Sequence, residues 1–163
     1  MLFYKYLFKC ILIIFEEVVG LWWVLWWGCR VKINLFNIYN MEDKECYNFN
    51  KISFKDGFFD DSCSATYIIH LLGNGRRDDI DKQLNTFHPT KTVFILENKG
   101  FKKCKKPLKK QKARYDLIHC YYTIFKHAQE NNYENILILE DDFIFDENIL
   151  KQEIHNDINQ FVN

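Results

Sequence analysis

The sequence has little proline and glycine, and no excess of charge of either sign. Its 163 residues include two prolines and six glycines, too few breaks for a collagen-like or linker-rich chain. Lysine and arginine together number 22, as do aspartate and glutamate, so no overall field draws the chain toward nucleic acid or an anionic membrane. The composition therefore argues against nucleic acid as a partner, and the length suits one domain of roughly 100 to 200 residues.

Closely spaced metal ligands are also lacking. No two of the six cysteines lie closer than 16 residues apart, and none of the five histidines belongs to an HExxH helix. Zinc ribbons, knuckles and zinc-protease helices are thereby excluded. Cysteines scattered in this way favour buried free thiols over a disulfide framework, and with them a reducing compartment. The positions concerned are Cys10, Cys29, Cys46, Cys63, Cys104 and Cys120.

An unbroken membrane-spanning run is missing as well. Residues 10–29 approach the roughly 20 apolar residues that cross a bilayer, but Glu16 and Glu17 interrupt them. Four tryptophans in this segment suit a membrane interface. One interpretation makes residues 1–40 a single anchor or interfacial helix that associates the protein with a membrane. The other starts translation at Met41, so that residues 1–40 are upstream read-through and the protein is cytoplasmic.

The rest of the chain alternates between two patterns. Residues 41–65 show no clear period and are predicted to be an irregular lead-in. From residue 66, short apolar runs alternate with helical stripes: strands are expected at 66–72, 92–96 and 135–139, and helices at 76–87, around 117–131 and after a cap at Asp146. This order predicts an α/β domain over 66–163, an open, mostly parallel sheet with helices on both faces. Ligands bind such sheets beyond the carboxyl ends of the strands.

The first strand is followed by a glycine turn with two of the four arginines of the chain, Gly73-Asn74-Gly75-Arg76-Arg77. Glycines let a backbone approach a phosphate, and arginine offers a two-pronged donor to the same oxygens. Arg76 and Arg77 are therefore candidate ligands of a phosphate group. The alternative is an ordinary turn with solvated arginines.

The third strand runs directly into three carboxylates, Glu140-Asp141-Asp142. Three adjacent acids beside a buried strand repel one another unless a cation or hydrogen-bond donors lie among them. In an extended chain Glu140 and Asp142 point to one side and Asp141 to the other. Asp142 with Glu140 is thus a candidate site for Mg²⁺ or Mn²⁺. The alternative is an acidic loop that caps the next helix.

The segments NILILEDDFIFDENI and TYIIHLLGNGRRDDIDKQL resemble glycosyltransferase family 25, the lipopolysaccharide and collagen-type glycosyltransferases. The resemblance spans roughly residues 66–150. It implies the donor-binding half of a GT-A type, Rossmann-like domain that takes a nucleotide-diphosphate sugar as donor and a glycan or protein as acceptor. It further implies that Asp142 ligates Mn²⁺ or Mg²⁺, that Glu140 and Asp141 assist through the metal or the ribose, and that Arg76 or Arg77 lies near the donor.

Two features depart from that family. His119-Cys120 stands where a Ser-His pair is expected, so no role is carried onto His119, and no residue is assigned as general base or other catalytic group. Only 21 residues follow Asp142. We therefore expect a donor-binding half that lacks the acceptor half. The alternative function is a non-catalytic, membrane-associated fragment that binds a nucleotide sugar or a partner without transferring anything.

Residues 99–114 carry nine positive charges, no acid and a single aromatic residue, Phe101. A solvated loop is the simplest interpretation. The run could also attract the donor diphosphate or place the domain on a membrane surface.

Overall fold

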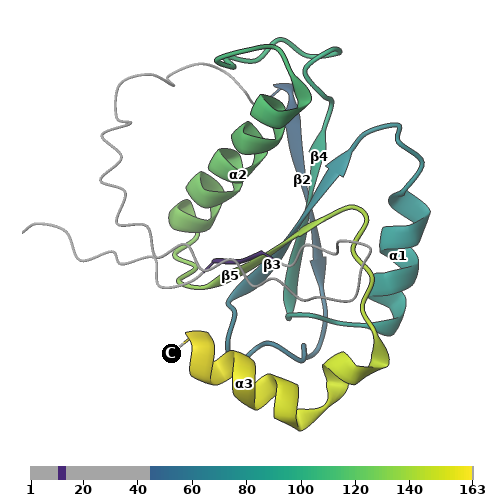
Figure 1. The fold of residues 1–163 in the computed structure, drawn as a ribbon, viewed down its shortest axis with the longest axis vertical. Helices are drawn as coiled ribbons and strands as arrows, with labels where there is room; N and C mark the ends of the chain where they lie inside the picture. Colours follow the sequence, from purple (N-terminus) through teal and green to yellow (C-terminus); the bar gives the residue numbers. More distant parts are fainter. Residues whose placement is uncertain (1–10, 14–44, 163) are drawn as a thin grey trace, which may run out of the picture.

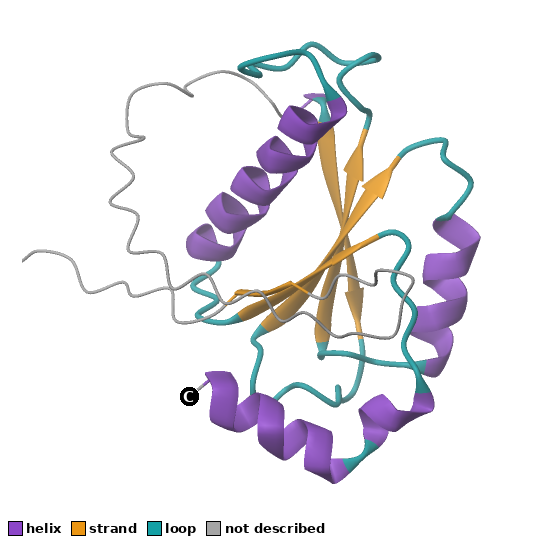
Figure 2. Cartoon of the chain, viewed as in Figure 1, coloured by secondary structure: helices purple, strands orange, loops and turns teal. Residues whose placement is uncertain are grey.

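A computed structural model of the chain describes residues 11–13 and 45–162 (Figure 1). One five-stranded sheet has the order β1-β5-β3-β4-β2. Helices α1 and α3 and the short 3₁₀ helix η2 lie to one side and α2 lies to the other (Figure 2). The elements in chain order are β1 (Ile11–Ile13), β2 (Tyr47–Ser53), β3 (Ala65–Leu71), α1 (Arg77–Thr86), β4 (Thr92–Asn98), α2 (Ala113–Glu130), β5 (Ile136–Glu140), η2 (Glu147–Leu150) and α3 (Gln152–Val162).

The sheet is mixed. Strands β1, β5, β3 and β4 pair in parallel, whereas β2 runs antiparallel to β4 from the Tyr47–Asn98 pair to the Ser53–Thr92 pair. The predicted α/β class is confirmed, but the prediction of a mostly parallel sheet is wrong. The prediction of irregular structure before residue 66 is wrong for β2, whose sequence YNFNKIS is that of a half-exposed edge strand and lacks an apolar run.

The predicted N-terminal helix lies outside the described residues, except for Ile11–Ile13. Those three residues form β1 and pair with Ile136–Ile138 of β5. Within the part of the chain that the structure describes, no helix combines the length and apolar character needed to cross a membrane.

Alternate residues of the central strands build two cores, one on each face of the sheet. Tyr67 and Ile69 of β3 pack with Ile124 of α2, whereas Ile68 packs with Ile80 and Leu84 of α1. Strands buried on both faces explain the continuous apolar runs in the sequence. The same arrangement brings the carboxyl ends of β3, β4 and β5 to one edge of the sheet.

The cysteines divide into a bonded and a free group. Cys46, just before β2, forms a disulfide with Cys104 in the β4–α2 loop, with the two Cα atoms 5.6 Å apart. Cys63 and Cys120 are buried free thiols, and burial raises the pKa of Cys120 to about 12. The free-thiol prediction is therefore confirmed for these two and wrong for Cys46 and Cys104. The expectation of a reducing compartment was based on all six cysteines being free, and the disulfide removes that basis.

The last predicted helix is divided in two. Asp146 caps η2, accepting a hydrogen bond from the backbone N–H of Asn148 at 2.8 Å, as its predicted capping role requires. Helix α3 starts two residues after η2 ends.

Candidate functional site

Asp141 is the centre of the contacts at the carboxyl edge of the sheet. Its Oδ2 atom accepts hydrogen bonds from the backbone N–H of Leu71, at 3.0 Å, and from the Asn74 side chain. The Asp141 side chain is only 13% exposed. This carboxylate therefore ties the end of β5 to the end of β3 and to the turn that follows it.

The glycine turn is shaped to place Arg76. Gly73 and Gly75 have φ values of +85° and +83°, which side chains rarely tolerate. Between them, Asn74 accepts a hydrogen bond from the backbone N–H of Arg76 at 3.1 Å through its side-chain oxygen. The turn thereby holds the start of the Arg76 side chain beside the carboxylates.

Arg76 bridges two of the three acids. Its Nη1 atom lies 3.3 Å from Oδ1 of Asp141 and 3.1 Å from Oδ2 of Asp142. The hydrogen bond that Arg76 donates to Asp142 is the main cause that raises the pKa of Arg76 above its usual value. Asp142 is 65% exposed and Arg76 is 45% exposed, so both groups are open to a ligand from solvent.

His70 is a part of the site that the sequence did not single out. It lies in β3 and is 3% exposed, with Nδ1 3.4 Å from Oδ2 of Asp141. This contact is not a hydrogen bond, and it is an ion pair only when the imidazole is protonated. A histidine within an apolar strand, one residue from its end, was the available signal.

Arg77 does not join these acids. Its guanidinium contacts Asp81, one turn further along α1, and Glu97 near the end of β4, at 3.1 Å in each case. The structure therefore brings Arg76 to Asp141 and Asp142 and directs Arg77 to the neighbouring strand end. Glu97 is a second member of this edge that the sequence analysis did not identify.

Glu140 points away from the other two acids. Its Oε1 atom accepts a hydrogen bond from the hydroxyl of Tyr121 in α2 at 3.2 Å. The predicted alternation, with Glu140 and Asp142 on one side, is wrong because β5 ends at Glu140 and the chain turns, with Phe143 N–H bonded to the carbonyl of Glu140. Asp141 and Asp142 then reach the same guanidinium.

Burial raises the pKa of Glu140 above the usual carboxyl value, and the charges of Asp142 and Asp141 add to this while the Tyr121 hydrogen bond opposes it. Folding therefore favours the protonated form of Glu140. The free energy of unfolding loses this contribution as the pH rises from the ordinary carboxyl pKa through the raised one.

Replacing Glu140 by Gln should consequently raise the free energy of unfolding at pH 7, because the amide keeps an acceptor for Tyr121 without the charge. The gain should disappear below about pH 4, where the carboxyl is protonated in both states. Urea unfolding at the two pH values measures it, with Glu134→Gln, an exposed site, as the matched control. A variant less stable than the parent at pH 7 would contradict this explanation.

A depression of about 540 Å³ lies beside the glycine turn, in the size range of ligand pockets. It is lined by Glu45, Tyr47, Asn48, Leu72, Glu97 and Lys99. Leu72 directly precedes the turn, and Glu97 is the partner of Arg77. A basic side chain also approaches: the Nζ atom of Lys103 lies 3.4 Å from where a Cβ atom on Gly73 would be. Positive groups from the start of α1 and from the β4–α2 loop therefore lie near this part of the edge.

Of the three acids, Asp142 is the one exposed enough to share a metal ion with a phosphate ligand. In the described part of the chain, no three His, Cys, Asp or Glu side chains are grouped so as to hold a metal ion by themselves. Mg²⁺ commonly takes only one or two protein carboxylates and completes its shell with phosphate oxygens and water. Asp142 offers an exposed carboxylate for such a shell, and Arg76 already provides a positive charge at the same place.

Comparison of the chain with protein-family models, with curated proteins and with solved structures found no match.

Proposed function

We propose that the chain binds a nucleotide-diphosphate sugar at the carboxyl edge of its sheet, with a divalent metal at Asp142, and acts in glycosyl transfer. The observation that carries the proposal is the convergence of Arg76, Asp141 and Asp142 where two neighbouring parallel strands end. Open α/β sheets bind ligands at this edge. The resemblance of LEDD and of the preceding strand to glycosyltransferase family 25 supports the donor class and a GT-A type, Rossmann-like half-domain.

The contacts divide the roles among the acids. Among the contacts described, Asp142 is exposed and held only by Arg76, and it would bind Mn²⁺ or Mg²⁺. Asp141 fixes the glycine turn through Leu71 and Asn74, so its role is to position Arg76. Glu140 would serve the ribose or a metal-bound water from its half-buried place beside Tyr121.

Arg76 would neutralise charge on the donor. Its guanidinium can leave Asp142 for a diphosphate oxygen when a metal takes over that carboxylate, because arginine binds phosphate with two parallel donors. A bound metal would act as a Lewis acid on the leaving diphosphate. Arg77 pairs with Asp81 and Glu97 and not with these acids, so it is assigned no part in this exchange.

The second candidate is binding without transfer, as a membrane-associated fragment or as one part of an assembly. One observation favours it: Asp141 and Glu140 are engaged by the chain itself, through Leu71, Asn74, Arg76 and Tyr121, so neither carboxylate is free to act as a general base in transfer. Release of UDP from UDP-glucose in the presence of an acceptor mixture separates the two candidates. Turnover above background supports transfer, and donor binding without turnover supports the second candidate.

Replacing Asp142 by Ala should weaken binding of UDP-glucose or UDP-galactose in the presence of Mn²⁺ at least about tenfold, because a charge-assisted ligand contributes about 1.5–3 kcal/mol. Isothermal titration calorimetry of the full chain measures this. The matched control is Asp157→Ala on the exposed face of α3, which should bind like the parent.

Two outcomes would overturn the donor site. One is the absence of any Mn²⁺-dependent heat with either sugar nucleotide. The other is equal binding by the Asp142 and Asp157 variants.

A further inference from the structure

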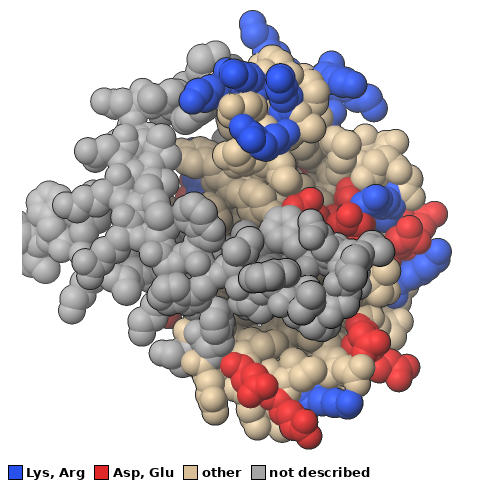
Figure 3. All heavy atoms as spheres, in the orientation of Figure 1, with Lys and Arg blue, Asp and Glu red and all other residues tan. Residues whose placement is uncertain are grey.

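The loop between β4 and α2 presents a dense positive surface. We call residues 99–112 together with Arg114 the basic loop. Eight of its nine basic side chains are exposed, and no acidic residue interrupts them. Figure 3 shows blue side chains gathered at the end of the molecule where this loop lies in Figure 1. The exposed members are Lys99, Lys102, Lys103, Lys105, Lys109, Lys110, Lys112 and Arg114.

The ninth basic residue is an anchor rather than a surface group. Lys106 is 2% exposed, and its ammonium group pairs with Asp116 of α2 and donates to the side chain of Asn98 at the end of β4. It also lies over the ring of Tyr47, 4.3 Å from the centroid. A lysine this deeply buried requires such partners.

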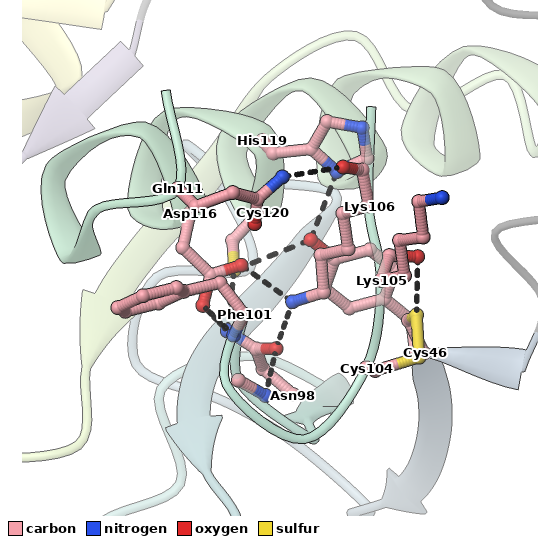
Figure 4. Close-up of a disulfide and its surroundings, with 12 residues drawn as sticks. Cys46, Asn98, Phe101, Cys104, Lys105, Lys106, Gln111, Asp116, His119 and Cys120 are labelled. Carbon is pink, nitrogen blue, oxygen red and sulfur yellow. Dashed lines mark hydrogen bonds and ion pairs between the residues drawn. A yellow bond between two sulfur atoms is a disulfide. The ribbon is translucent and has the colours of Figure 1, made fainter. Parts of the chain in front are cut away.

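Further bonds hold the loop at both sides of Lys106. The backbone N–H of Phe101 donates to Asp116 at 3.0 Å, and Gln111 donates to the carbonyl of Lys106 at 3.0 Å. The disulfide joins Cys104 to Cys46 in the same cluster (Figure 4). The exposed lysines therefore project from a fixed framework and do not form a free tail.

The chemistry of the surface fits a layer of phosphate or carboxylate charge. Seven of the eight exposed groups are lysines. Their ammonium groups are compact point charges and lack the planar guanidinium with which arginine binds one phosphate through two parallel hydrogen bonds. Phe101, the single aromatic residue of the basic loop, and Tyr115, which follows Arg114, are both half-buried, and Arg114 lies over the Tyr115 ring. Neither ring is free as a platform on which nucleic-acid bases would stack.

Two exposed apolar side chains border the basic loop. Ile118 is 56% exposed and lies one helical turn beyond Arg114, on the same face of α2. Leu71 is 43% exposed, and its Cδ1 atom lies 3.0 Å from where a Cβ atom on Gly100 would be. Lysines beside exposed aliphatic groups are the combination by which proteins bind anionic bilayers.

We propose that the basic loop, with Ile118 and Leu71 at its margin, docks the domain on the surface of an anionic lipid bilayer. The sequence adds a reason: four tryptophans lie among residues 22–27, and tryptophan suits a membrane interface. The inference does not depend on the proposed donor site, since its test contains neither sugar nucleotide nor metal.

The test is co-sedimentation of the full chain with vesicles of phosphatidylcholine alone and with vesicles containing 30% phosphatidylserine, at about 0.1 M salt. Residues 10–29 can bind both kinds of vesicle, so the preference for the anionic vesicles measures the contribution of positive charge, which the substitutions below assign to the basic loop. We expect that preference in the parent and its loss at about 1 M salt, where the screening length falls to about 3 Å.

The decisive variant replaces Lys102, Lys103, Lys109 and Lys110 by Gln. Each lysine near an anionic surface contributes about fivefold to binding, so the preference should fall at least about tenfold. The control replaces four exposed lysines elsewhere, Lys55, Lys82, Lys126 and Lys151, by Gln and changes the net charge equally. Because all eight side chains are exposed, thermal unfolding should show both variants to be folded.

Three results would overturn the proposal. The first is equal binding of the parent to neutral and anionic vesicles. The second is an equal effect of the two sets of substitutions, which would show that only net charge matters. The third is tighter binding to poly(U) than to anionic vesicles at the same salt concentration, which would assign the surface to RNA.

Discussion

Replacing Lys106 by Met should lower the free energy of unfolding by about 3–5 kcal/mol, because removing one partner of a buried ion pair leaves the other charge uncompensated. Asp116 would be that charge. It is buried and would retain only the backbone N–H of Phe101 and the amide of Asn98 as donors. Methionine fills the space of the lysine stem, so the loss reports on the charge and not on a cavity. Urea unfolding followed by circular dichroism measures it.

Two further variants make the result specific. Lys106→Met combined with Asp116→Asn should recover more than half of the loss, since the amide oxygen still accepts from Phe101 and no unpaired charge remains. Lys105→Met, at the exposed neighbouring position, should stay within about 0.5 kcal/mol of the parent. If the substitutions at 105 and 106 cost the same, Lys106 does not anchor the loop.

Replacing both Cys46 and Cys104 by Ser should cost about 4 kcal/mol. The two cysteines are 58 residues apart, and closing a loop of that length removes much entropy from the unfolded chain. The bond also fastens the start of β2, an edge strand that pairs only with β4 in the described sheet. Urea unfolding of the parent and of the variant under oxidising conditions gives the difference.

The redox control uses the same two proteins. A dithiol reductant should destabilise the parent to the level of the double variant and leave the double variant itself unchanged. This comparison separates the Cys46–Cys104 bond from any effect of the other four cysteines. A parent whose stability is the same with and without reductant would contradict the disulfide.

The parts of the fold that could be predicted are those whose sequence pattern reflects burial directly. Strands β3, β4 and β5 are apolar on both faces, and their positions follow from the runs YIIHLL, VFIL and ILIL. Strand β2 could not be found in this way because an edge strand buries only alternate side chains and YNFNKIS is mostly polar. The Cys46–Cys104 pair depends on tertiary contact between β2 and a distant loop, for which spacing carries no signal.

In the candidate site, too, some features could be predicted from the sequence and others could not. The rule that ligands bind at strand ends directs attention to Arg76, Asp141 and Asp142, and the structure brings these three side chains together. The rule does not distinguish Arg76 from Arg77, because the pairing of Arg77 with Glu97 depends on the exact conformation of the turn. Nor does it distinguish Lys106 from the exposed lysines around it, since its burial depends on Asp116, ten residues further along the chain.

The central claim is that Asp142 and the donor together hold a divalent metal. The most direct measurement is the electron paramagnetic resonance signal of free Mn²⁺ in the presence of the full chain, of UDP-glucose, and of both. We predict that the mixture removes more free Mn²⁺ than the two components do separately, and that Asp142→Ala abolishes this excess. A mixture that leaves as much free Mn²⁺ as expected from the chain and UDP-glucose measured apart would contradict the account.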